Sequence, residues 1–266
     1  MTSFPPLHVR NPAATAAHTN TIILLHGRGS NGHIFADELL EARTSAGLSL
    51  AEHFPGWRWV FPSTKPRWST VFQEEMSEWF DTYSLSDTDA KQHLQVEGLR
   101  EAVQFVTEVV EREVELLGGR AGKVVLGGIS QGEAVALQAL FCGQQRIGAF
   151  VGVSGWLPFA RQVEGVLSEG GAESVGVALR KNLGLEIGDA PNTNVVQGTP
   201  VFLGHGADDS WVDVSLGQYV RDVLVHMGMQ VSWREYTGAK VDGHWLKETE
   251  EFDDIVAFLT RTFDLA

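Results

Sequence analysis

The sequence KVVLGGISQG at residues 123–132 joins a strand to a helix through a very tight turn. Residues 123–126 are an apolar run typical of a buried strand, and residues 131–141 are apolar on nearly all sides, which predicts a buried helix. Between them Gly128, Ser130 and Gly132 form the pattern G-x-S-x-G, in which a strained turn exposes a serine hydroxyl at a helix N-terminus. A side chain at either glycine would collide with the neighbouring strand or helix. This context favours Ser130 as a nucleophile over a solvated serine in an ordinary glycine-rich turn.

Similar apolar runs recur along the chain and alternate with helical patterns. The strand-like runs cover residues 21–25, 57–61, 149–153, 200–203 and 230–236. Apolar residues at helical spacing cover residues 89–117, 216–227 and 252–263. This alternation predicts an α/β fold, with a mostly parallel central sheet and helices on both faces. We expect a single domain over residues 1–266.

One stretch departs from the alternation. Residues 159–198 are polar and rich in glycine, with only a weak helical pattern at 173–183. The stretch is too long for an ordinary connection between two elements. We therefore expect either a cap over the site or a surface insertion within the domain.

The composition narrows the classes of function. The 266 residues carry 20 Lys and Arg against 34 Asp and Glu, a formal net charge of −14, which argues against nucleic acid as a partner. Cys142 is the single cysteine, so the chain can form no internal disulfide and no cysteine-based metal site. The first twenty residues resemble no secretory signal, and no apolar run is long enough to cross a membrane. We expect a cytoplasmic protein without a stable membrane anchor.

A second glycine-rich turn follows the predicted strand at 21–25. The sequence HGRGSNG at 26–32 is typical of a loop that brings a backbone N–H over the nucleophile. A tetrahedral oxyanion needs two such donors, and the candidates are the backbone N–H groups of Arg28 and Gln131. Because His26 lies at the end of the strand, we expect it to be structural and not a base.

A serine hydroxyl needs a base to take its proton, and the base in turn needs an acid to orient it. The expected chain order is Ser, acid, His. His244, in the loop sequence VDGHW at 241–245, is the histidine that fits this order. Asp208 and Asp209 both follow the predicted strand at 200–203, and their spacing does not choose between them. We expect the aspartate that is not the acid to serve a turn or a helix cap.

Six segments in this order resemble the acyl-protein thioesterase group of the phospholipase/carboxylesterase family, which has the α/β-hydrolase fold. They are LLHGRGSNG at 24–32, EWFD at 78–81, GGISQGEAVAL at 127–137, SGWLP at 154–158, GHGADDSWV at 204–212 and GHW at 243–245. The resemblance implies Ser130 as nucleophile, Asp209 as acid and His244 as base. It also implies oxyanion donors at Arg28 and Gln131, and neither a cofactor nor a metal.

The sequence departs from the family at the residue after Gly132, the last residue of the G-x-S-x-G turn. The family commonly has a second glycine there, whereas this chain has Glu133. A carboxylate in the first turn of a helix suits the helix dipole, and near the site we expect it to disfavour anionic acyl chains.

Four of the matching segments contain a tryptophan. These are Trp79, Trp156, Trp211 and Trp245. Aromatic walls suit an apolar acyl chain, and Trp79 and Trp156 are the candidates for substrate binding. Taken one at a time, each of the four is more typical of a core position.

The resemblance implies hydrolysis of S-acylated proteins or of lysophospholipids, and hence a role in lipid metabolism. The residues by themselves support a narrower statement: an ester or thioester with an apolar acyl part is the substrate. One alternative is a general carboxylesterase that acts on short-chain esters. Another is a catalytically silent module that binds a small molecule or a protein, against which the presence of all three triad residues counts.

Overall fold

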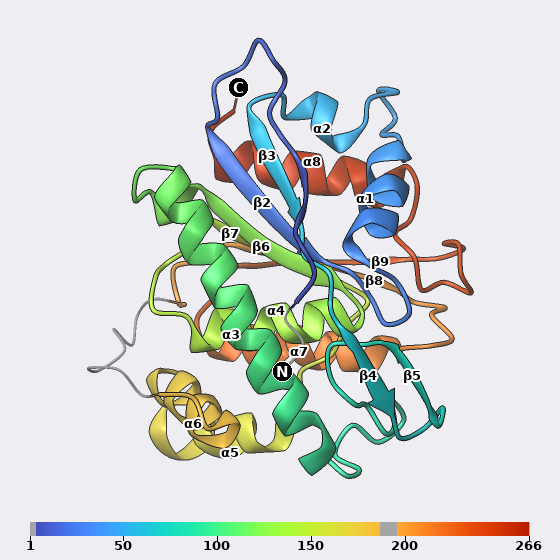
Figure 1. The fold of residues 1–266 in the computed structure, drawn as a ribbon, viewed down its shortest axis with the longest axis vertical. Helices are drawn as coiled ribbons and strands as arrows, with labels where there is room; N and C mark the ends of the chain where they lie inside the picture. The colour runs from blue at the N-terminus through green and yellow to red at the C-terminus, as the bar shows by residue number, and fades with distance from the viewer. Residues whose placement is uncertain (1–3, 187–195, 266) are drawn as a thin grey trace.

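A central sheet organises the computed structural model, which describes residues 4–186 and 196–265 (Figure 1). Seven strands lie in the order β1-β3-β2-β6-β7-β8-β9, and every neighbouring pair is parallel except β1 with β3. The strands are β1 (His8–Arg10), β2 (Asn20–Leu25), β3 (Trp57–Phe61), β6 (Val124–Ile129), β7 (Ala149–Val153), β8 (Val201–Gly206) and β9 (Val231–Tyr236). A separate antiparallel hairpin joins β4 (Pro66–Ser69) to β5 (Glu74–Ser77). The predicted α/β class with a mostly parallel sheet is confirmed.

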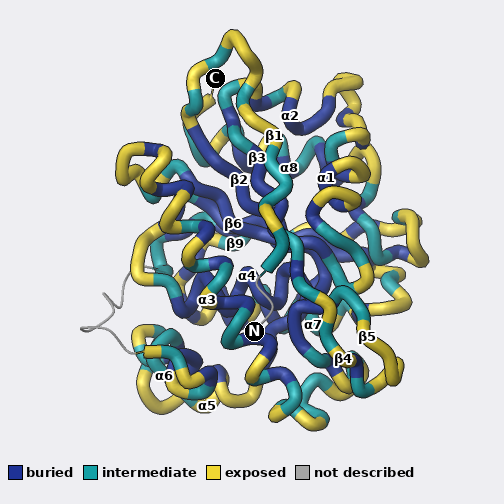
Figure 2. The backbone as a smooth tube through the Cα atoms, viewed as in Figure 1, coloured by how far each residue is buried: buried dark blue, intermediate teal, exposed yellow. Residues whose placement is uncertain are grey.

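Helices cover both faces of the sheet. One face carries α3 (His93–Leu116), α4 (Gln131–Cys142), α6 (Glu173–Leu183) and α7 (Val214–His226), whose apolar residues share one core with the sheet. The opposite face carries α1 (Gly32–Glu41), α2 (Leu50–His53) and α8 (Glu250–Thr262), which form a second core. The central strands β2, β6, β7 and β8 and the helix α4 are buried throughout (Figure 2).

The sequence explains the two helices that matter most for the site. In α3 apolar residues recur every three or four positions, and Leu99, Val103 and Val106 are buried against the sheet. In α4 every residue is buried, as its almost entirely apolar sequence predicts. This helix therefore has a fixed position behind the turn that carries Ser130.

The stretch 159–198 contains two helices, α5 (Ala160–Gly170) and α6, which pack on each other. Helix α6 also packs against α3 and α4, and its residues Val175, Leu179 and Leu183 are fully buried. Residues 187–195 of the same stretch lie outside the described residues.

Within residues 4–186 and 196–265, no helix combines the length and the apolar character that crossing a bilayer requires.

Candidate active site

Ser130 occupies the sharp turn between β6 and α4. Its backbone has φ 57° and ψ −125°, a conformation that few residues other than glycine adopt. The Ser130 N–H donates to the Val153 carbonyl at the end of β7 at 2.8 Å, which ties the turn to the neighbouring strand. A Cβ at Gly132 would lie 2.2 Å from the Leu25 carbonyl oxygen, and one at Gly128 would lie 2.6 Å from the Gly132 backbone. The glycines therefore allow a close approach that no larger residue permits.

His244 lies in the loop after β9, and the structure brings it next to Asp209 in the loop after β8. Its Nδ1 is 2.7 Å from the Asp209 Oδ2. The other carboxylate oxygen of Asp209 accepts the backbone N–H groups of Trp211 and Val212 at 2.8 and 2.9 Å. Burial alone would raise the pKa of Asp209, but the hydrogen bonds from His244 and the backbone lower it. Asp209 is therefore an ionised carboxylate that can orient an imidazole.

Asp208, which spacing alone could not distinguish from Asp209, has a different partner. Its Oδ2 accepts the Gly238 backbone N–H at 2.8 Å, so it ties the loop after β8 to the loop after β9. This contact joins two loops, so Asp208 serves neither a local turn nor a helix cap, which were the roles expected for the second aspartate. The cap of helix α7 is Asp213 instead.

His205 is a supporting residue that the sequence analysis did not single out. It is buried at the end of β8, and its Nε2 lies 2.9 Å from the Val212 carbonyl and 3.7 Å from the Asp209 carboxylate. Burial lowers the pKa of His205, so the ring is neutral and its Nε2–H donates to Val212. This hydrogen bond helps to fix the loop that carries Asp209. The sequence signal was its place in the segment GHGADDSWV.

The two candidate oxyanion donors line the same pocket as Ser130. Gln131 is the first residue of α4, and Arg28 lies in the loop after β2. Among the described residues, neither backbone N–H donates a hydrogen bond to the protein, so both can bind a substrate oxygen. The Gln131 side chain fixes the neighbouring segment, because its Oε1 accepts the Trp79 N–H at 2.8 Å and its Nε2 donates to the Phe80 carbonyl at 2.7 Å.

His26 has the structural position that the sequence suggested. Its ring is fully buried, and its Nε2 accepts the Thr64 N–H at 3.1 Å while its Nδ1–H donates to the Gly27 carbonyl at 2.7 Å. Burial lowers its pKa to about 4. A neutral ring with both nitrogens bonded to the backbone shapes the loop that carries Arg28.

Ser130 and His244 line one pocket of about 240 Å³. Its wall is mostly apolar, and the apolar side chains are those of Phe35, Leu85, Ile129, Trp156, Trp211, Val212, Val241 and Trp245. Such a wall fits the apolar part of a substrate better than a charged one. No described residue between 159 and 198 contributes to it, so the pocket wall gives no support to a cap formed by that stretch.

The two tryptophans proposed for substrate binding have different positions. Trp156 lines the pocket, as expected. Trp79 does not, which corrects that part of the prediction. It is fully buried, and its Nε1–H donates to the His26 carbonyl at 2.9 Å, so it supports the oxyanion loop from behind.

Glu133 also differs from expectation. Its side chain is fully enclosed and does not line the pocket, so it cannot repel an acyl chain there. The carboxyl fills the space beside Gly152 and Gly155, where a Cβ would lie 2.7 Å and 2.5 Å from its oxygens. Burial raises the pKa of Glu133 to about 8, so near neutral pH it is mostly a neutral acid.

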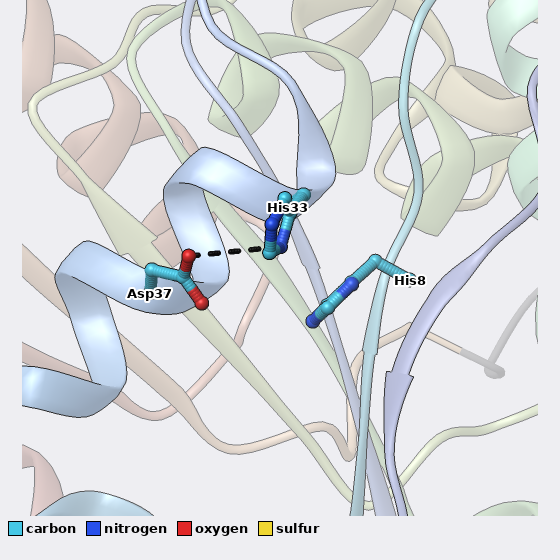
Figure 3. A group of neighbouring side chains, drawn as sticks. All are labelled: His8, His33 and Asp37. Atoms are coloured by element: carbon cyan, nitrogen blue, oxygen red, sulfur yellow. Dashed lines mark ion pairs between the residues drawn. The ribbon is translucent and has the colours of Figure 1, made fainter.

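A possible metal-ligand group lies outside the pocket (Figure 3). It consists of His8 on β1 with His33 and Asp37 on α1, and the ligand atoms lie within 4.8 Å of one another. His33 Nδ1 is 3.6 Å from Asp37 Oδ2, and both side chains are largely exposed. None of the three residues lines the pocket that contains Ser130.

Comparisons with known proteins identify the relatives of this chain. The sequence profile of the phospholipase/carboxylesterase family matches residues 8–173. Acyl-protein thioesterase 1 of Yarrowia lipolytica is 30% identical over 237 residues, which cover 88% of this chain and 89% of that protein. The protein of the same name from Cryptococcus neoformans var. neoformans is 28% identical over 79% of this chain and 74% of its own length. The crystal structure of Zea mays acyl-protein thioesterase 2 aligns with a TM-score of 0.70 and 25% identity, over 97% of this chain and 99% of that one.

Proposed function

Because the chain belongs to the phospholipase/carboxylesterase family of α/β-hydrolases, we propose that it is a serine hydrolase of thioesters or carboxylic esters with apolar acyl groups. The observation that carries the proposal is one pocket lined both by Ser130, which is held in a strained turn, and by His244, whose ring is oriented by Asp209. A binding module would have no need for this arrangement.

The mechanism follows from the roles of these groups. The Ser130 Oγ attacks the carbonyl carbon while Nε2 of His244 takes its proton, and Asp209 stabilises the imidazolium that forms. The N–H groups of Arg28 and Gln131 bind the oxyanion. Collapse of the tetrahedral intermediate breaks the bond to the leaving group. A leaving alkoxide takes the proton from His244. A thiolate can leave as the anion, and His244 then releases its proton to solvent before it acts as the base again.

The acyl-enzyme is then hydrolysed by the same groups. Water attacks the Ser130 ester as His244 takes a proton from it, and a second tetrahedral intermediate forms in the same oxyanion site. Its collapse returns the proton to the Ser130 Oγ and releases the carboxylic acid. Each step balances with water as the sole co-substrate.

The substrates that the pocket fits are acyl groups with an apolar chain, and the relatives' name, acyl-protein thioesterase, supports S-acylated proteins as one source. The aromatic wall of Trp156 and Phe35 offers contact area to a long chain. A preference for short-chain esters is the main alternative within the same chemistry. A competition assay between a long-chain acyl thioester and a short acetate ester separates the two, because a kcat/KM higher for acetate by orders of magnitude rejects the thioesterase assignment.

Labelling with a fluorophosphonate probe tests the nucleophile directly. Intact-mass detection is expected to show one adduct on the wild type and none on Ser130→Ala. Ser154→Ala is the matched control, because Ser154 also follows a strand and has a positive φ but does not line the pocket. Labelling that persists in Ser130→Ala, or that is lost in Ser154→Ala, would reject Ser130 as the nucleophile.

A further inference from the structure

Trp211 stacks against the ring of the base. Its indole lies parallel to the His244 imidazole, with an angle of 7° between the planes and 5.8 Å between the ring centroids. We infer that Trp211 is a positioning residue for His244 and that its indole face stabilises the imidazolium formed during the reaction. This inference rests on the proposed function, in which His244 is the base.

The position of the indole is fixed by the same carboxylate that holds the base. Asp209 binds Nδ1 of His244 through one oxygen and the backbone N–H of Trp211 through the other. The Trp211 Nε1–H points to the Asp242 carboxylate at 3.5 Å, on the loop that carries His244. The indole and the imidazole are therefore attached to one another through the two loops and not through the core.

Burial does not explain a tryptophan at this position. The exposed fraction of Trp211 is 54%, whereas Trp79 and Trp156 have 0% and 3%. A large aromatic side chain that remains in solvent gains little from burial, so its contact with the ring of the base is the interaction that distinguishes it. This contact also corrects the expectation that Trp211 fills the core.

The physical effect follows from the electron distribution of the indole. The face of the ring carries negative charge density and attracts a cation within about 6 Å of its centroid. This face stabilises the neutral imidazole little, but it stabilises the positively charged imidazolium. Since the imidazolium forms as Ser130 attacks, the interaction is stronger in the transition state than in the resting enzyme, which is the condition for a rate effect.

Other charged or titratable groups also act on His244 and must be distinguished from the indole. Asp209 is in direct contact, and His205 lies behind that carboxylate. Asp242 lies in the same loop as His244, and Arg28 and Glu38 line the same pocket as His244. Substitution of Trp211 keeps all five side chains but removes the indole N–H that points to Asp242. Because Trp211→Phe and Trp211→Leu both lack this donor, the difference between them reports the aromatic face alone.

The test compares Trp211→Phe and Trp211→Leu, with Trp68→Leu as control. Trp68 on β4 is similarly exposed, at 56%, and does not line the pocket. The pH profile of kcat/KM is measured with one thioester substrate. We expect the acid limb to move to lower pH by about half a pH unit in Trp211→Leu, with a plateau about three- to fivefold lower. The phenylalanine variant is expected to lie between leucine and wild type, and the control to match wild type.

An NMR titration of the His244 ring in Ser130→Ala protein checks the same effect without turnover. The protonation midpoint is expected to fall in the order Trp, Phe, Leu at position 211. Identical midpoints in all three proteins, or a change in KM alone with an unmoved acid limb, would overturn the inference and make Trp211 a plain wall of the pocket. Since the NMR readout needs no catalysis, failure of the proposed function appears separately, as absence of the fluorophosphonate adduct.

Discussion

Replacing Glu133 with glutamine tests whether the first turn of α4 holds a neutral acid. The residue is fully buried beside Gly152 and Gly155, one turn from Ser130, and burial raises its pKa from 4.5 to about 8. The buried Glu251 raises it slightly further, while a hydrogen bond from the Gly155 backbone lowers it. Glutamine keeps the shape of the side chain and removes the ionisation.

The sign of the effect follows from the protonation of the two states. Above pH 4.5 the unfolded chain releases the Glu133 proton, but the folded protein keeps it up to about pH 8. The contribution of Glu133 to the free energy of unfolding is therefore fully present below pH 4.5. It is lost as the pH rises towards 8. Each pH unit in this window is worth about 1.4 kcal/mol, so the range from about pH 5 to about pH 7.5 corresponds to roughly 3 kcal/mol.

Urea unfolding of the wild type and Glu133→Gln at several pH values measures this difference. We expect the variant to gain roughly 3 kcal/mol relative to the wild type between about pH 5 and about pH 7.5. Glu251, whose pKa burial also raises to about 8, contributes the same slope to both proteins and cancels. Glu115→Gln, at an exposed position on α3, is the control and should follow the wild type at every pH.

A difference between Glu133→Gln and wild type that stays constant across this pH range would refute the argument. It would mean that Glu133 is ionised in the folded protein, and that its carboxylate has hydrogen bonds strong enough to offset its burial. A constant unfolding slope m against urea is required throughout, because a change in m would indicate a change in the unfolded ensemble instead.

Three further predictions concern the pocket and its frame. Trp156→Ala should lower kcat/KM for a long-chain thioester by about tenfold or more, because Trp156 lines the pocket, and should lower kcat/KM for an acetate ester much less. Equal losses for both substrates would contradict a role of Trp156 in binding the acyl chain. Gly132→Ala should destabilise the protein by about 3 kcal/mol and reduce fluorophosphonate labelling, since its Cβ would lie 2.2 Å from the Leu25 carbonyl; an unchanged thermal midpoint would argue against this turn. His205→Gln should lower kcat with little change in KM, because the hydrogen bond to Val212 helps to position Asp209 and does not touch substrate; a change confined to KM would disagree.

The sequence predicts those parts of the molecule in which backbone geometry dictates the residue type. The glycines at 128 and 132 are required by contacts shorter than a Cβ allows, and the run at 149–153 is apolar because both of its faces are covered. The same reasoning places the loops of Asp209 and His244 at the carboxyl ends of neighbouring strands. These features follow from the local residue pattern and from the order of the segments along the chain, and both can be read from a single sequence.

Shorter elements were missed because their signals are local and weak. Helix α1 has an asparagine cap, with Asn31 accepting two backbone N–H groups, and buries Phe35 and Leu39 four residues apart. Strand β1 has three residues, and its position on the sheet depends on pairing with β3, about fifty residues later in the chain. Pairing over such a distance leaves no periodic pattern in so short a segment.

The direction in which an individual side chain points could not be predicted from the sequence. The corrections to the predicted site residues are of this kind. The place of Glu133 in the first turn of α4 was clear, but its carboxyl turns away from the pocket because Gly152 and Gly155, on another strand and loop, leave space for it. Trp79 and Trp156 both belong to segments that match the family, yet only Trp156 lines the pocket. Hydrogen bonds with Gln131 and His26 hold Trp79 behind the loop that carries Arg28.

Asp209 shows why such directions matter for function. One of its oxygens holds the imidazole of His244, and the other holds the backbone of the segment from which Trp211 projects over that imidazole. His205 fixes the end of the same segment through Val212. A single ionised carboxylate therefore sets both the tautomer of the base and the aromatic surface against its face. Since both act on the same imidazolium, their energetic effects should be coupled, and removing the indole should cost less once the carboxylate has been removed.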